Sequence, residues 1–384
     1  MSNNVKFSVL FPTKNRLDLL KHGINSVLNQ DYNNWEIIVS DNCSQDDVKG
    51  YIDSLNDERI KYIRQEKPLS VCSNWNAAND QATGDYVIML GDDDALLPYY
   101  FTTCLKEIVK NEDLELIYHS VYYYKQPNVS MYEPDGWVKS SKPFHPITKA
   151  TDEPYILDKN ARLKEIQSTL NMWYTFGFNA QFFLYSKELI QKMEKHGKFY
   201  QPPFPDTYAA NMMMLIAEKV VIIPQELVIL GITPKSYGWY AENNKEKEGM
   251  TFHKDADYRE YAPKSIKSKL CNIAEMQTAA FATLALIPEK FPERKDLKLI
   301  TKSYFKRVIE RVINESDKKE ANEVLSKEVY SKMSLLHRME LYFYAKKLFK
   351  KKKPRAIVLD KSTSYENVSL LIEDIVNKKQ PAKI

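Results

Sequence analysis

SNWNAANDQATGDYVIMLGDDDALLP, residues 73–98, is the stretch that decides the fold. Its first part, Asn74–Ala82, has the character of a helix. The apolar run Tyr86–Leu90 follows, and three consecutive aspartates come directly after that run. A short apolar run bounded by turn residues is typical of a buried strand. We therefore predict a helix, a buried strand and an acidic loop in this order.

The rest of residues 1–125 repeats this alternation. Strands are predicted at Phe7–Phe11, Trp35–Ser40, Arg59–Arg64 and Leu114–His119, and helices at Arg16–Gln30, Asp46–Leu55 and from Pro98 to about Lys110. Repeated units of this length favour a mostly parallel sheet covered by helices. In such α/β sheets, ligands bind at the carboxyl ends of the strands. We therefore expect a Rossmann-like, mixed and mostly parallel sheet flanked by helices, with its site in the loops that follow the strands.

The later part of the chain is organised differently. Prolines punctuate residues 126–155, where we expect a long loop or an irregular hairpin. Strand-like and helix-like segments resume over 158–232, a second irregular stretch covers 233–263, and residues beyond 263 are helical in character. We expect one domain over 1–262, with a nucleotide-binding half at about 1–125 and an acceptor half at about 126–262. A helical C-terminal region would cover 263–384.

The composition excludes several classes of protein. The chain has 384 residues, of which 43% are hydrophobic and 28% charged, so disorder as the main state is excluded. A net charge of +4 argues against a general nucleic-acid binder. The four isolated cysteines favour reduced thiols over a zinc ribbon or a disulfide framework. We see no secretory signal, and the longest apolar run, Ala279–Ile287, is far below the roughly 20 residues of a membrane span. We therefore expect a cytoplasmic protein.

The acidic loop Gly91–Asp94 is the first candidate site. Three neighbouring carboxylates repel one another strongly unless a cation lies among them. Asp92 and Asp94 are two residues apart, so in an extended segment their side chains point to the same side. Such oxygen ligands suit Mg²⁺ or Mn²⁺ carrying a diphosphate. The alternative is a solvated acidic turn.

Two further loops follow predicted strands. Pro12, Thr13, Asn15 and Arg16 come after the first strand, where backbone groups and a cation could hold a nucleotide. Asp41 follows the second strand and could accept hydrogen bonds from a ribose or a base. A capped helix start and an ordinary turn are the respective alternatives. All three loops could line one crevice.

Residues 6–97 resemble the family 2 glycosyltransferases, which have the nucleotide-diphospho-sugar transferase (GT-A) fold. SVLFPTKNR looks like the first strand and loop of that family, and WEIIVSDNCSQD looks like its second strand with the nucleotide-contacting aspartate, here Asp41. Asn76 and Gly84 keep the spacing of the family. Trp75 stands where many members have Arg, and Gly91 stands where many have the first aspartate of the metal motif.

The resemblance implies an inverting, metal-dependent glycosyltransferase. It would move a sugar from a nucleotide-sugar, commonly a UDP-sugar, to a hydroxyl of a growing surface glycan of capsular or lipopolysaccharide type, free or lipid-linked. Mn²⁺ or Mg²⁺ would be the cofactor, with Asp92 and Asp94 as its ligands. The donor contacts implied are Pro12, Thr13, Asn15, Arg16, Asp41, Asn74, Asn76, Asp92, Asp93 and Lys235.

The acceptor side should supply the general base. Asp206, after Pro205, resembles the acidic motif that provides it in this family, although Asp is also a favoured helix N-cap. Lys235 lies in a loop that could close over a diphosphate, and His253 is a weak candidate for a third metal ligand. Trp173 and Tyr174 could stack on an acceptor sugar, although aromatic residues beside a strand are more often core.

The segment Leu335–Lys353 joins apolar and aromatic residues to a block of lysines. As a helix it would suit an anionic membrane surface, through Lys346–Lys353, so we expect peripheral contact with the inner face of the cell membrane. The alternative is a packed helix with a solvated basic end. Nucleic acid is not an expected partner, and a homo-oligomer through the C-terminal helices stays open. Residues 355–384 suggest one strand and one amphipathic helix of no assigned function.

Two other functions stay open. A nucleotidyltransferase would also combine a nucleotide, a metal and an α/β sheet, but it usually has a Gly-rich phosphate loop, and only 10 glycines occur in this chain. A catalytically silent relative could act as a binding or assembly subunit. The intact aspartates at 92–94 and Asp206 argue against that reading.

Overall fold

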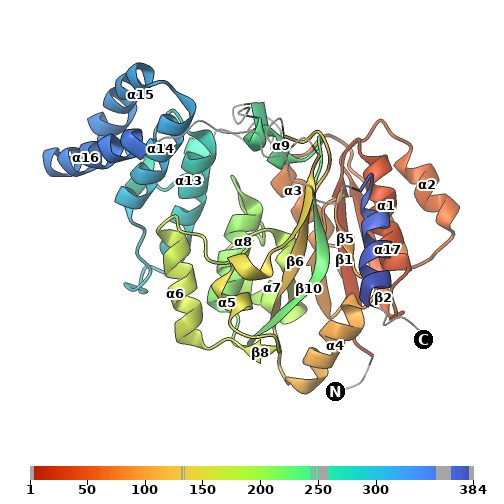
Figure 1. Cartoon of the computed structure of the whole chain (residues 1–384). Coiled ribbons are helices and arrows are strands. Elements are labelled where there is room, and N and C mark those ends of the chain that lie inside the picture. Colours follow the sequence, from red (N-terminus) through yellow and green to blue (C-terminus); the bar gives the residue numbers. More distant parts are fainter. Residues whose placement is uncertain are drawn as a thin grey trace.

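The computed structural model describes residues 4–130, 133, 135–243, 245, 248–249, 258–351 and 365–379. One sheet of ten strands runs through the molecule, in the order β3-β2-β1-β4-β9-β6-β10-β5, with β7 beside β6 and β8 beside β10 (Figure 1). The strands are β1 Phe7–Thr13, β2 Trp35–Asp41, β3 Ile60–Arg64, β4 Tyr86–Met89, β5 Ala95–Leu96, β6 Leu116–Lys125, β7 Trp137–Ser140, β8 Tyr155–Ile156, β9 Phe183–Ser186 and β10 Val220–Ile232.

Most strands of the sheet point the same way. β3, β2, β1 and β4 are mutually parallel, with Phe7 opposite both Trp35 and Tyr86. β9 pairs antiparallel with β4 and β6, and β10 runs parallel to β6. The carboxyl ends of β1, β2 and β4 therefore meet at one edge, where the acidic loop follows β4. This confirms the mixed, mostly parallel α/β sheet of the GT-A type that was expected.

Helices flank the sheet on both faces, and the described helices also include several that extend away from it (Figure 1). They are α1 Leu17–Leu28, α2 Val48–Leu55, α3 Val71–Asn79, α4 Tyr100–Lys110, α5 Pro146–Lys149, α6 Lys159–Leu170, α7 Lys187–Glu194, α8 Pro205–Ile216, α9 Tyr237–Glu242, α11 Tyr258–Tyr261, α12 Lys264–Lys267, α13 Glu275–Lys290, α14 Thr301–Glu315, α15 Lys318–Val324, α16 Leu335–Lys351 and α17 Val368–Lys379. Short side chains begin several of them: Ser70 accepts a hydrogen bond from the backbone N–H of Ser73, and Ser186 accepts one from Leu189.

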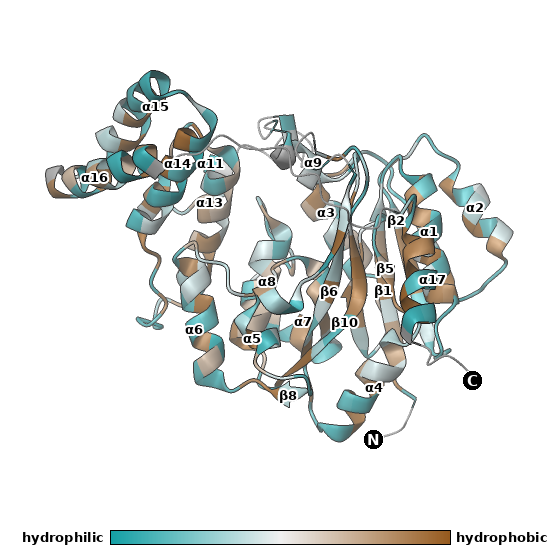
Figure 2. Cartoon of the chain, viewed as in Figure 1, coloured by the Kyte–Doolittle hydropathy of each residue, from teal (hydrophilic) through white to brown (hydrophobic). Residues whose placement is uncertain are grey.

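The core lies between these helices and the sheet. Leu10, Ile38, Ile88, Ile117 and Ile222, one from each of five strands, are completely buried. Burying a side chain of this size contributes about 1.5–3 kcal/mol to folding. Figure 2 shows hydrophobic residues along much of β6 and β10, whereas α15 at the edge of the molecule is largely hydrophilic. Strands buried on both faces explain why the sequence shows continuous apolar runs rather than alternation.

Most of the C-terminal helices gather at one end of the molecule, which confirms the helical C-terminal region. α13 packs on α8 and α6, α14 packs on α13, and α16 packs on α14. Apolar side chains of α13 and α14 belong to the same continuous core as the sheet. The domain boundary near residue 262 stays a prediction. None of the described helices is both long and apolar enough to span a membrane.

The helix α17 does not join this group. It lies beside α1, on the half of the molecule that contains β1, β2 and β3 (Figure 1). The His22 Nδ1 atom is 2.8 Å from the Ser369 hydroxyl, and the Tyr124 hydroxyl donates to the Tyr365 carbonyl at 2.6 Å. Val368 and Leu371 are buried against apolar residues of β5 and β10. The chain therefore returns to its N-terminal half, which the sequence did not indicate.

The segment over residues 126–155, expected as a long loop or an irregular hairpin, contains a hairpin strand. β7 pairs antiparallel with the end of β6, with Tyr122 opposite Ser140. A short 3₁₀ turn, Lys142–Phe144, and the short helix α5 follow. The two-residue strand β5 was not expected. It follows the acidic loop at once and pairs with β10, which joins that loop to the opposite side of the sheet.

Candidate active site

A pocket of about 1070 Å³ opens at the carboxyl ends of β1, β4 and β10. The opposite wall comes from α3, from the start of α8, and from α13 and α14. Eleven of the residues expected at the site line it: Pro12, Thr13, Asn15, Arg16, Asn74, Asp92, Asp93, Asp94, Trp173, Tyr174 and Asp206. The fold therefore brings together residues that lie up to almost 200 positions apart in the sequence.

Three expected residues do not belong to the pocket lining. Asp41 is completely buried at the end of β2, where it accepts hydrogen bonds from the Tyr62 hydroxyl at 2.7 Å and from Arg64 Nη1 at 2.9 Å. Asn76 exchanges two hydrogen bonds with the backbone of Tyr200. These two side chains therefore have structural contacts beside the pocket. Asn42, next to Asp41, lines the pocket instead.

Lys235 is the third of these residues. Its Nζ atom lies 2.9 Å from an Asp18 carboxylate oxygen on α1, at the protein surface. Its carbonyl accepts a hydrogen bond from Arg16 Nη2. In this arrangement the loop contacts Arg16 of the pocket lining through its backbone, and the lysine side chain is paired at the protein surface.

The acidic loop is a tight turn. The Asp94 backbone N–H donates to the Gly91 carbonyl at 3.2 Å, so residues 91–94 are not extended. Asp92 points toward β1, where it pairs with Arg16 Nη1 at 2.8 Å and accepts from the Thr13 hydroxyl at 3.0 Å. The expectation that Asp92 and Asp94 share one side of an extended segment is therefore wrong, because the turn separates them.

Asp94 is almost completely buried and is held by three donors. The backbone N–H groups of Gly91 and Gly231 and the amide of Gln181 donate to it, at 2.6, 2.9 and 2.6 Å. Burial, followed by the charge of Asp93, raises the pKa of Asp94 to about 8. Burial also raises the pKa of Asp92, and Arg16 opposes this effect. The protein groups around the loop therefore neutralise only part of the negative charge of its three carboxylates.

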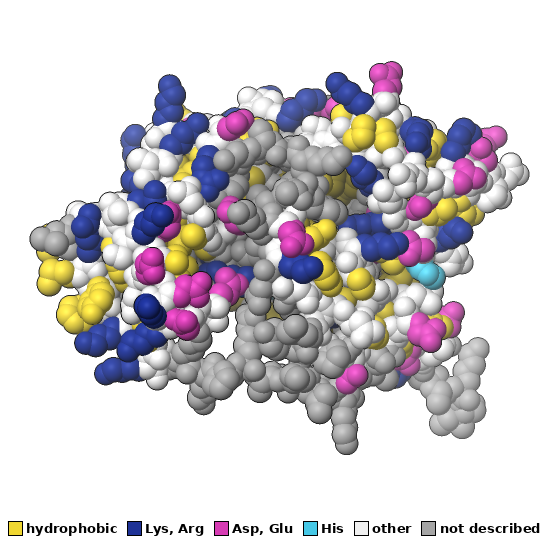
Figure 3. Space-filling model, turned by 90° about the horizontal axis from the view of Figure 1, so that it is seen from above, with side chains coloured by type: hydrophobic (Ala, Val, Ile, Leu, Met, Phe, Trp, Pro, Cys, Tyr) yellow, Lys and Arg dark blue, Asp and Glu magenta, His cyan; other side chains and the backbone are white. Residues whose placement is uncertain are grey.

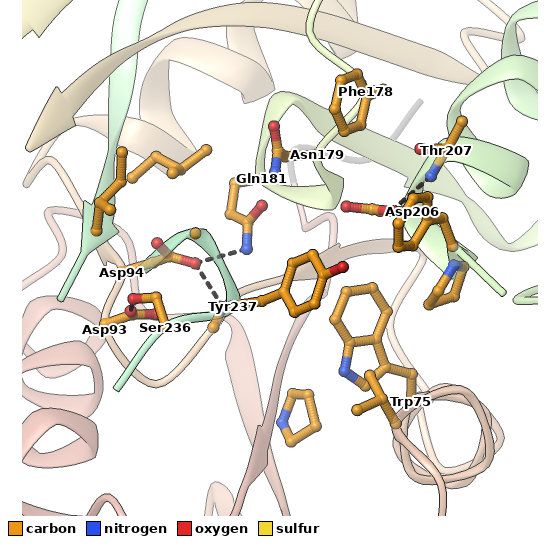
Figure 4. A pocket seen from close by; sticks show the side chains of 18 of the residues that line it. Trp75, Asp93, Asp94, Phe178, Asn179, Gln181, Asp206, Thr207, Ser236 and Tyr237 are labelled. Carbon is orange, nitrogen blue, oxygen red and sulfur yellow. Dashed lines mark hydrogen bonds between the residues drawn. The ribbon is translucent and has the colours of Figure 1, made fainter. Parts of the chain in front are cut away.

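Asp93 differs from its two neighbours because it is only half-buried. Its carboxylate accepts a hydrogen bond from the Thr233 hydroxyl at 3.3 Å. It also accepts one from the hydroxyl of Ser236, which lies next to it in Figure 4. Both hydroxyls belong to the loop that follows β10. Asp93 is therefore the carboxylate of the three that is most open to the pocket, and the 233–236 loop touches it directly.

Two carboxylate oxygens of the acidic loop converge above Gly91. A Cβ atom placed on Gly91 would lie 2.8 Å from Asp94 Oδ2 and 2.9 Å from Asp93 Oδ1, so these two oxygens converge where a side chain would otherwise be. Carboxylate oxygens are the ligands that Mg²⁺ and Mn²⁺ prefer. Within the described part of the chain, no group of three or more His, Cys, Asp or Glu side chains could hold a metal ion. His253 lies outside the described residues.

Asp206 lies across the pocket from the acidic loop. Figure 4 shows Asp206 and Asp94 on opposite sides, with the Tyr237 ring between them. Asp206 belongs to the first turn of α8, but the N-cap is Phe204, so Asp206 is not the N-cap that the alternative reading expected. Burial raises the pKa of Asp206 to about 6, although a hydrogen bond from the Thr207 backbone opposes this rise. A carboxylate with this pKa is suited to accept a proton near neutral pH.

Trp173 and Tyr174 form part of the wall beside Asp206. Their side chains are 62% and 37% exposed, so they are not core residues. The guanidinium carbon of Arg307, on α14, lies 5.1 Å from the centre of the Trp173 ring. Arg307 also donates to the Met172 carbonyl at 3.0 Å. The arginine therefore fixes an exposed aromatic surface of the kind on which sugar rings stack.

Several lining residues were missed by the sequence reasoning. Gln181 reaches the pocket from a segment that carries no motif, and Gln277 and Arg307 reach it from α13 and α14. Ser236 and Tyr237 also line it, and they belong to the loop around Lys235 that was expected to close over a diphosphate. Among the described residues, the buried Oε1 atom of Gln277 has no hydrogen-bond partner. An arginine on an amphipathic helix gives no sequence signal of a site. Only the packing of α13 on α8 places these side chains beside Asp206.

Comparison with known proteins agrees with this geometry. Residues 8–194 match the family model "Glycosyl transferase family 2". The putative colanic acid biosynthesis glycosyl transferase WcaA of Escherichia coli is 41% identical over 100 residues, which are 26% of this chain and 36% of that protein. The GalNAc(5)-diNAcBac-PP-undecaprenol beta-1,3-glucosyltransferase of Campylobacter jejuni is 39% identical over 128 residues, 33% of this chain and 41% of that protein.

A third relative is the UDP-Glc:alpha-D-GlcNAc-diphosphoundecaprenol beta-1,3-glucosyltransferase WfgD of Escherichia coli. It is 29% identical over 104 residues, which are 27% of this chain and 41% of that protein. The chain thus matches well under half of the length of each of these relatives. Residues 8–194 of this chain therefore form a glycosyl transferase family 2 domain.

Proposed function

We propose that this protein is an inverting glycosyltransferase that moves a sugar from a UDP-sugar to a hydroxyl of a growing surface glycan. One observation carries the proposal: a single pocket has a carboxylate-rich loop on one side and Asp206, with its raised pKa, on the other. Glycosyl transfer needs a place for a leaving diphosphate and a base for the acceptor hydroxyl. The two sides of the pocket supply these two functions.

The donor side would hold the nucleotide diphosphate. A divalent cation, Mn²⁺ or Mg²⁺, neutralises the charge of a leaving diphosphate when it is bound. We assign it to Asp93 and Asp94, whose oxygens converge above Gly91. This replaces the expected pair Asp92 and Asp94, because Asp92 is paired with Arg16. Thr13, Asn15, Asn42 and Asn74 line the same side and would contact the nucleoside.

The acceptor side would supply the base. The acceptor hydroxyl oxygen forms a bond to the anomeric carbon while the bond from that carbon to the diphosphate oxygen breaks. The hydroxyl proton passes to the carboxylate of Asp206. Because Asp206 and the acidic loop lie on opposite sides of the pocket, attack and departure occur on opposite faces of the sugar. This arrangement supports inversion at the anomeric carbon.

The acceptor would rest on Trp173 and Tyr174. Two of the relatives are named as enzymes that act on undecaprenol-linked glycans, and one is named for colanic acid synthesis. We therefore propose a lipid-linked or polymeric surface glycan as the acceptor, and the inner face of the cell membrane as the place of action. The name of the third relative, which begins with UDP-Glc, supports a UDP-sugar donor.

The test is release of nucleoside diphosphate from a panel of UDP-, GDP-, CMP- and dTDP-sugars, with Mn²⁺, Mg²⁺ or chelator. Slow hydrolysis of one donor without an acceptor, lost with chelator, is the expected result. Release of pyrophosphate instead would favour a nucleotidyltransferase. No turnover of any donor, even with lipid-linked acceptors present, and no thermal shift by any nucleotide would favour a silent binding subunit.

A variant of Gly91 tests the cation site itself. Gly91→Ala would place a methyl group 2.8–2.9 Å from the two converging oxygens, so the metal requirement should rise at least tenfold or activity should vanish. Gly238→Ala is the control, because its Cβ would make only an ordinary contact, at 3.4 Å with Ile232. Unchanged metal dependence in Gly91→Ala would contradict the assignment to Asp93 and Asp94.

A further inference from the structure

One side of α16 is unusually apolar for an exposed surface. Leu336, Met339, Tyr342 and Phe343 are 82%, 55%, 51% and 61% exposed. Their spacing places them along one side of the helix, since residues three and four apart are neighbours on a helix surface. Among the described residues, the opposite side of α16 packs on α14 through the buried Leu341 and Ala345. The exposed residues are therefore not part of the core.

Lysines continue the same side of the helix. Lys346, Lys347 and Lys350 are exposed, one to two turns beyond Phe343. The single acidic residue of α16, Glu340, is paired with Lys302 of α14 at 2.5 Å. The helix surface thus has an apolar half followed by a cationic half. We name these seven residues, Leu336, Met339, Tyr342, Phe343, Lys346, Lys347 and Lys350, the α16 face.

The α16 face lies at an outer edge of the molecule. In Figure 3, the edge where α15 and α16 are found in Figure 1 shows hydrophobic side chains, with lysines and arginines and also several acidic side chains close to them. Lys306 of the neighbouring α14 adds a cation and lies over the Tyr344 ring at 5.3 Å, whereas Lys302 is paired with Glu340. The local charge is therefore positive and complementary to an anionic surface.

We propose that the α16 face binds the surface of a phospholipid membrane that contains anionic lipids. Leu, Phe and Tyr side chains suit the boundary between headgroups and acyl chains, and lysines suit anionic headgroups. The inference goes beyond glycosyl transfer and can be measured without any substrate. It assigns the contact with the inner face of the cell membrane, the place of action proposed above, to a defined surface of the protein. Of the expected Lys346–Lys353 block, Lys352 and Lys353 lie outside the described residues and are not used here.

The position of α14 links this face to the acceptor wall of the pocket. The hydroxyl of Tyr344, on α16, donates to Glu310 of α14. The other carboxylate oxygen of Glu310 accepts from Arg307 Nη1 at 2.8 Å, and Arg307 stacks on Trp173 in the pocket. One helix therefore separates the α16 face from the acceptor side. A membrane-borne acceptor would reach the pocket from the side that touches the membrane.

The test is co-sedimentation of the full chain with lipid vesicles, in the absence of donor and acceptor. Wild-type protein should bind vesicles of mixed phosphatidylcholine and phosphatidylglycerol, and high salt should weaken binding. Replacing Lys346, Lys347 and Lys350 together by Glu should lower the partition coefficient by roughly 100-fold or more. The double variant Leu336→Ser, Phe343→Ser should also lower the partition coefficient, at low salt and at high salt.

Matched controls carry the same changes elsewhere. Lys106, Lys164 and Lys195 are exposed lysines of α4, α6 and the end of α7, so replacing all three by Glu gives the same change in net charge. This control should bind vesicles as tightly as the wild type apart from a small general charge effect. Val109→Ser, at a 46% exposed position on α4, is the apolar control.

Three results would overturn the proposal: wild-type protein that does not bind anionic vesicles, equal binding to pure phosphatidylcholine, or equal losses in the α16 and control variants. A dimer in solution that Leu336→Ser with Phe343→Ser dissociates would instead assign the face to a second copy of the chain. Donor hydrolysis without vesicles is measured in parallel. Its absence would count against the proposed function and leave the membrane result intact.

Discussion

Asp206 is the residue whose chemistry depends most on its surroundings. Burial at the start of α8 raises its pKa to about 6, which makes it a stronger base than an exposed aspartate. As a base it must be deprotonated, so kcat should fall about tenfold per pH unit below about pH 6. The pH profile of sugar transfer, measured at saturating donor, tests this.

Asp206→Asn should lower transfer by about 10²–10⁴-fold and leave nucleotide binding unchanged. Asp53→Asn, at an exposed position of α2, is the matched control and should transfer at the wild-type rate. A flat pH profile below pH 6 in the wild type, or an Asp206→Asn variant with normal transfer, would rule out Asp206 as the base.

Glu36 is a second buried carboxylate, but its role is in stability. Burial alone would raise the pKa of Glu36, yet hydrogen bonds from Lys6, Lys61, Ser8 and the Thr83 backbone outweigh burial and hold it well below its usual value of 4.5. Lys6, Ser8, Lys61 and Thr83 lie 2.7–2.8 Å from its oxygens. These bonds join β1 and β2 to the turn before β4.

The folded-state pKa of Glu36 is lower than the unfolded one, so its contribution to stability is present above about pH 4.5 and is lost as the pH falls through the folded pKa. Glu36→Gln should lower the free energy of unfolding at pH 7 by about 2–4 kcal/mol. The difference from wild type should shrink on acidification. Glu58→Gln, at an exposed position, is the control for denaturant titrations at both pH values.

At the scale of elements, β1, β2 and β4 could be predicted to within a few residues because each is mostly apolar, such as Tyr86–Leu90 for β4. The strand β6, by contrast, continues to Lys125, six residues beyond its predicted end at His119. The acidic loop could be placed at the site because it follows a well-marked strand, whereas Asp206 was expected there only from the resemblance to the family. The strand β5 has only two residues, and the turn at Gly91–Asp94 depends on its partners at Gly231 and Gln181. Neither could be found from local sequence.

The helix α17 gives a prediction at the same scale. Leu371 is 2% exposed and packs against the strand that follows the acidic loop, whereas its neighbour Leu370 is 42% exposed. Leu371→Ala should weaken the docking of α17 by about 2–3 kcal/mol. Amide exchange in α17 should then accelerate strongly, whereas Leu370→Ala should change it little. Equal exchange in the two variants would show that α17 does not depend on this contact.

At the scale of the whole molecule, the pocket is completed by helices that come after the matched family segment. Residues 8–194 include the donor side, but Gln277 and Arg307 belong to α13 and α14. No motif marks these helices, and their role follows only from the core that Phe281 and Tyr304 share with the sheet. This long-range packing is the part of the site that sequence reasoning could not supply.

A fragment of residues 1–262 tests whether the rest of the molecule needs the packing of α13 and α14. Ala279, Phe281, Leu284 and Ile287 of α13 are completely buried, so removing the helix exposes the apolar surfaces of α6 and α8 that it covers. We expect the fragment to aggregate or to elute as a large species in size-exclusion chromatography. A monomeric fragment with one sharp unfolding transition would instead show that residues 1–262 are an independent domain.

The return of α17 to the N-terminal half also has a consequence for biosynthesis. A nascent chain folds from its N-terminus, so β1 to β4 and α1 can assemble early. Ala95, Leu97, Tyr124 and Ile229, against which α17 packs, stay uncovered until residues 365–379 have left the ribosome. A chain whose translation stops early would keep this apolar surface exposed, in the form that chaperones and proteases recognise. A chain in which α17 covers this apolar surface is therefore a chain that was translated at least through residue 379.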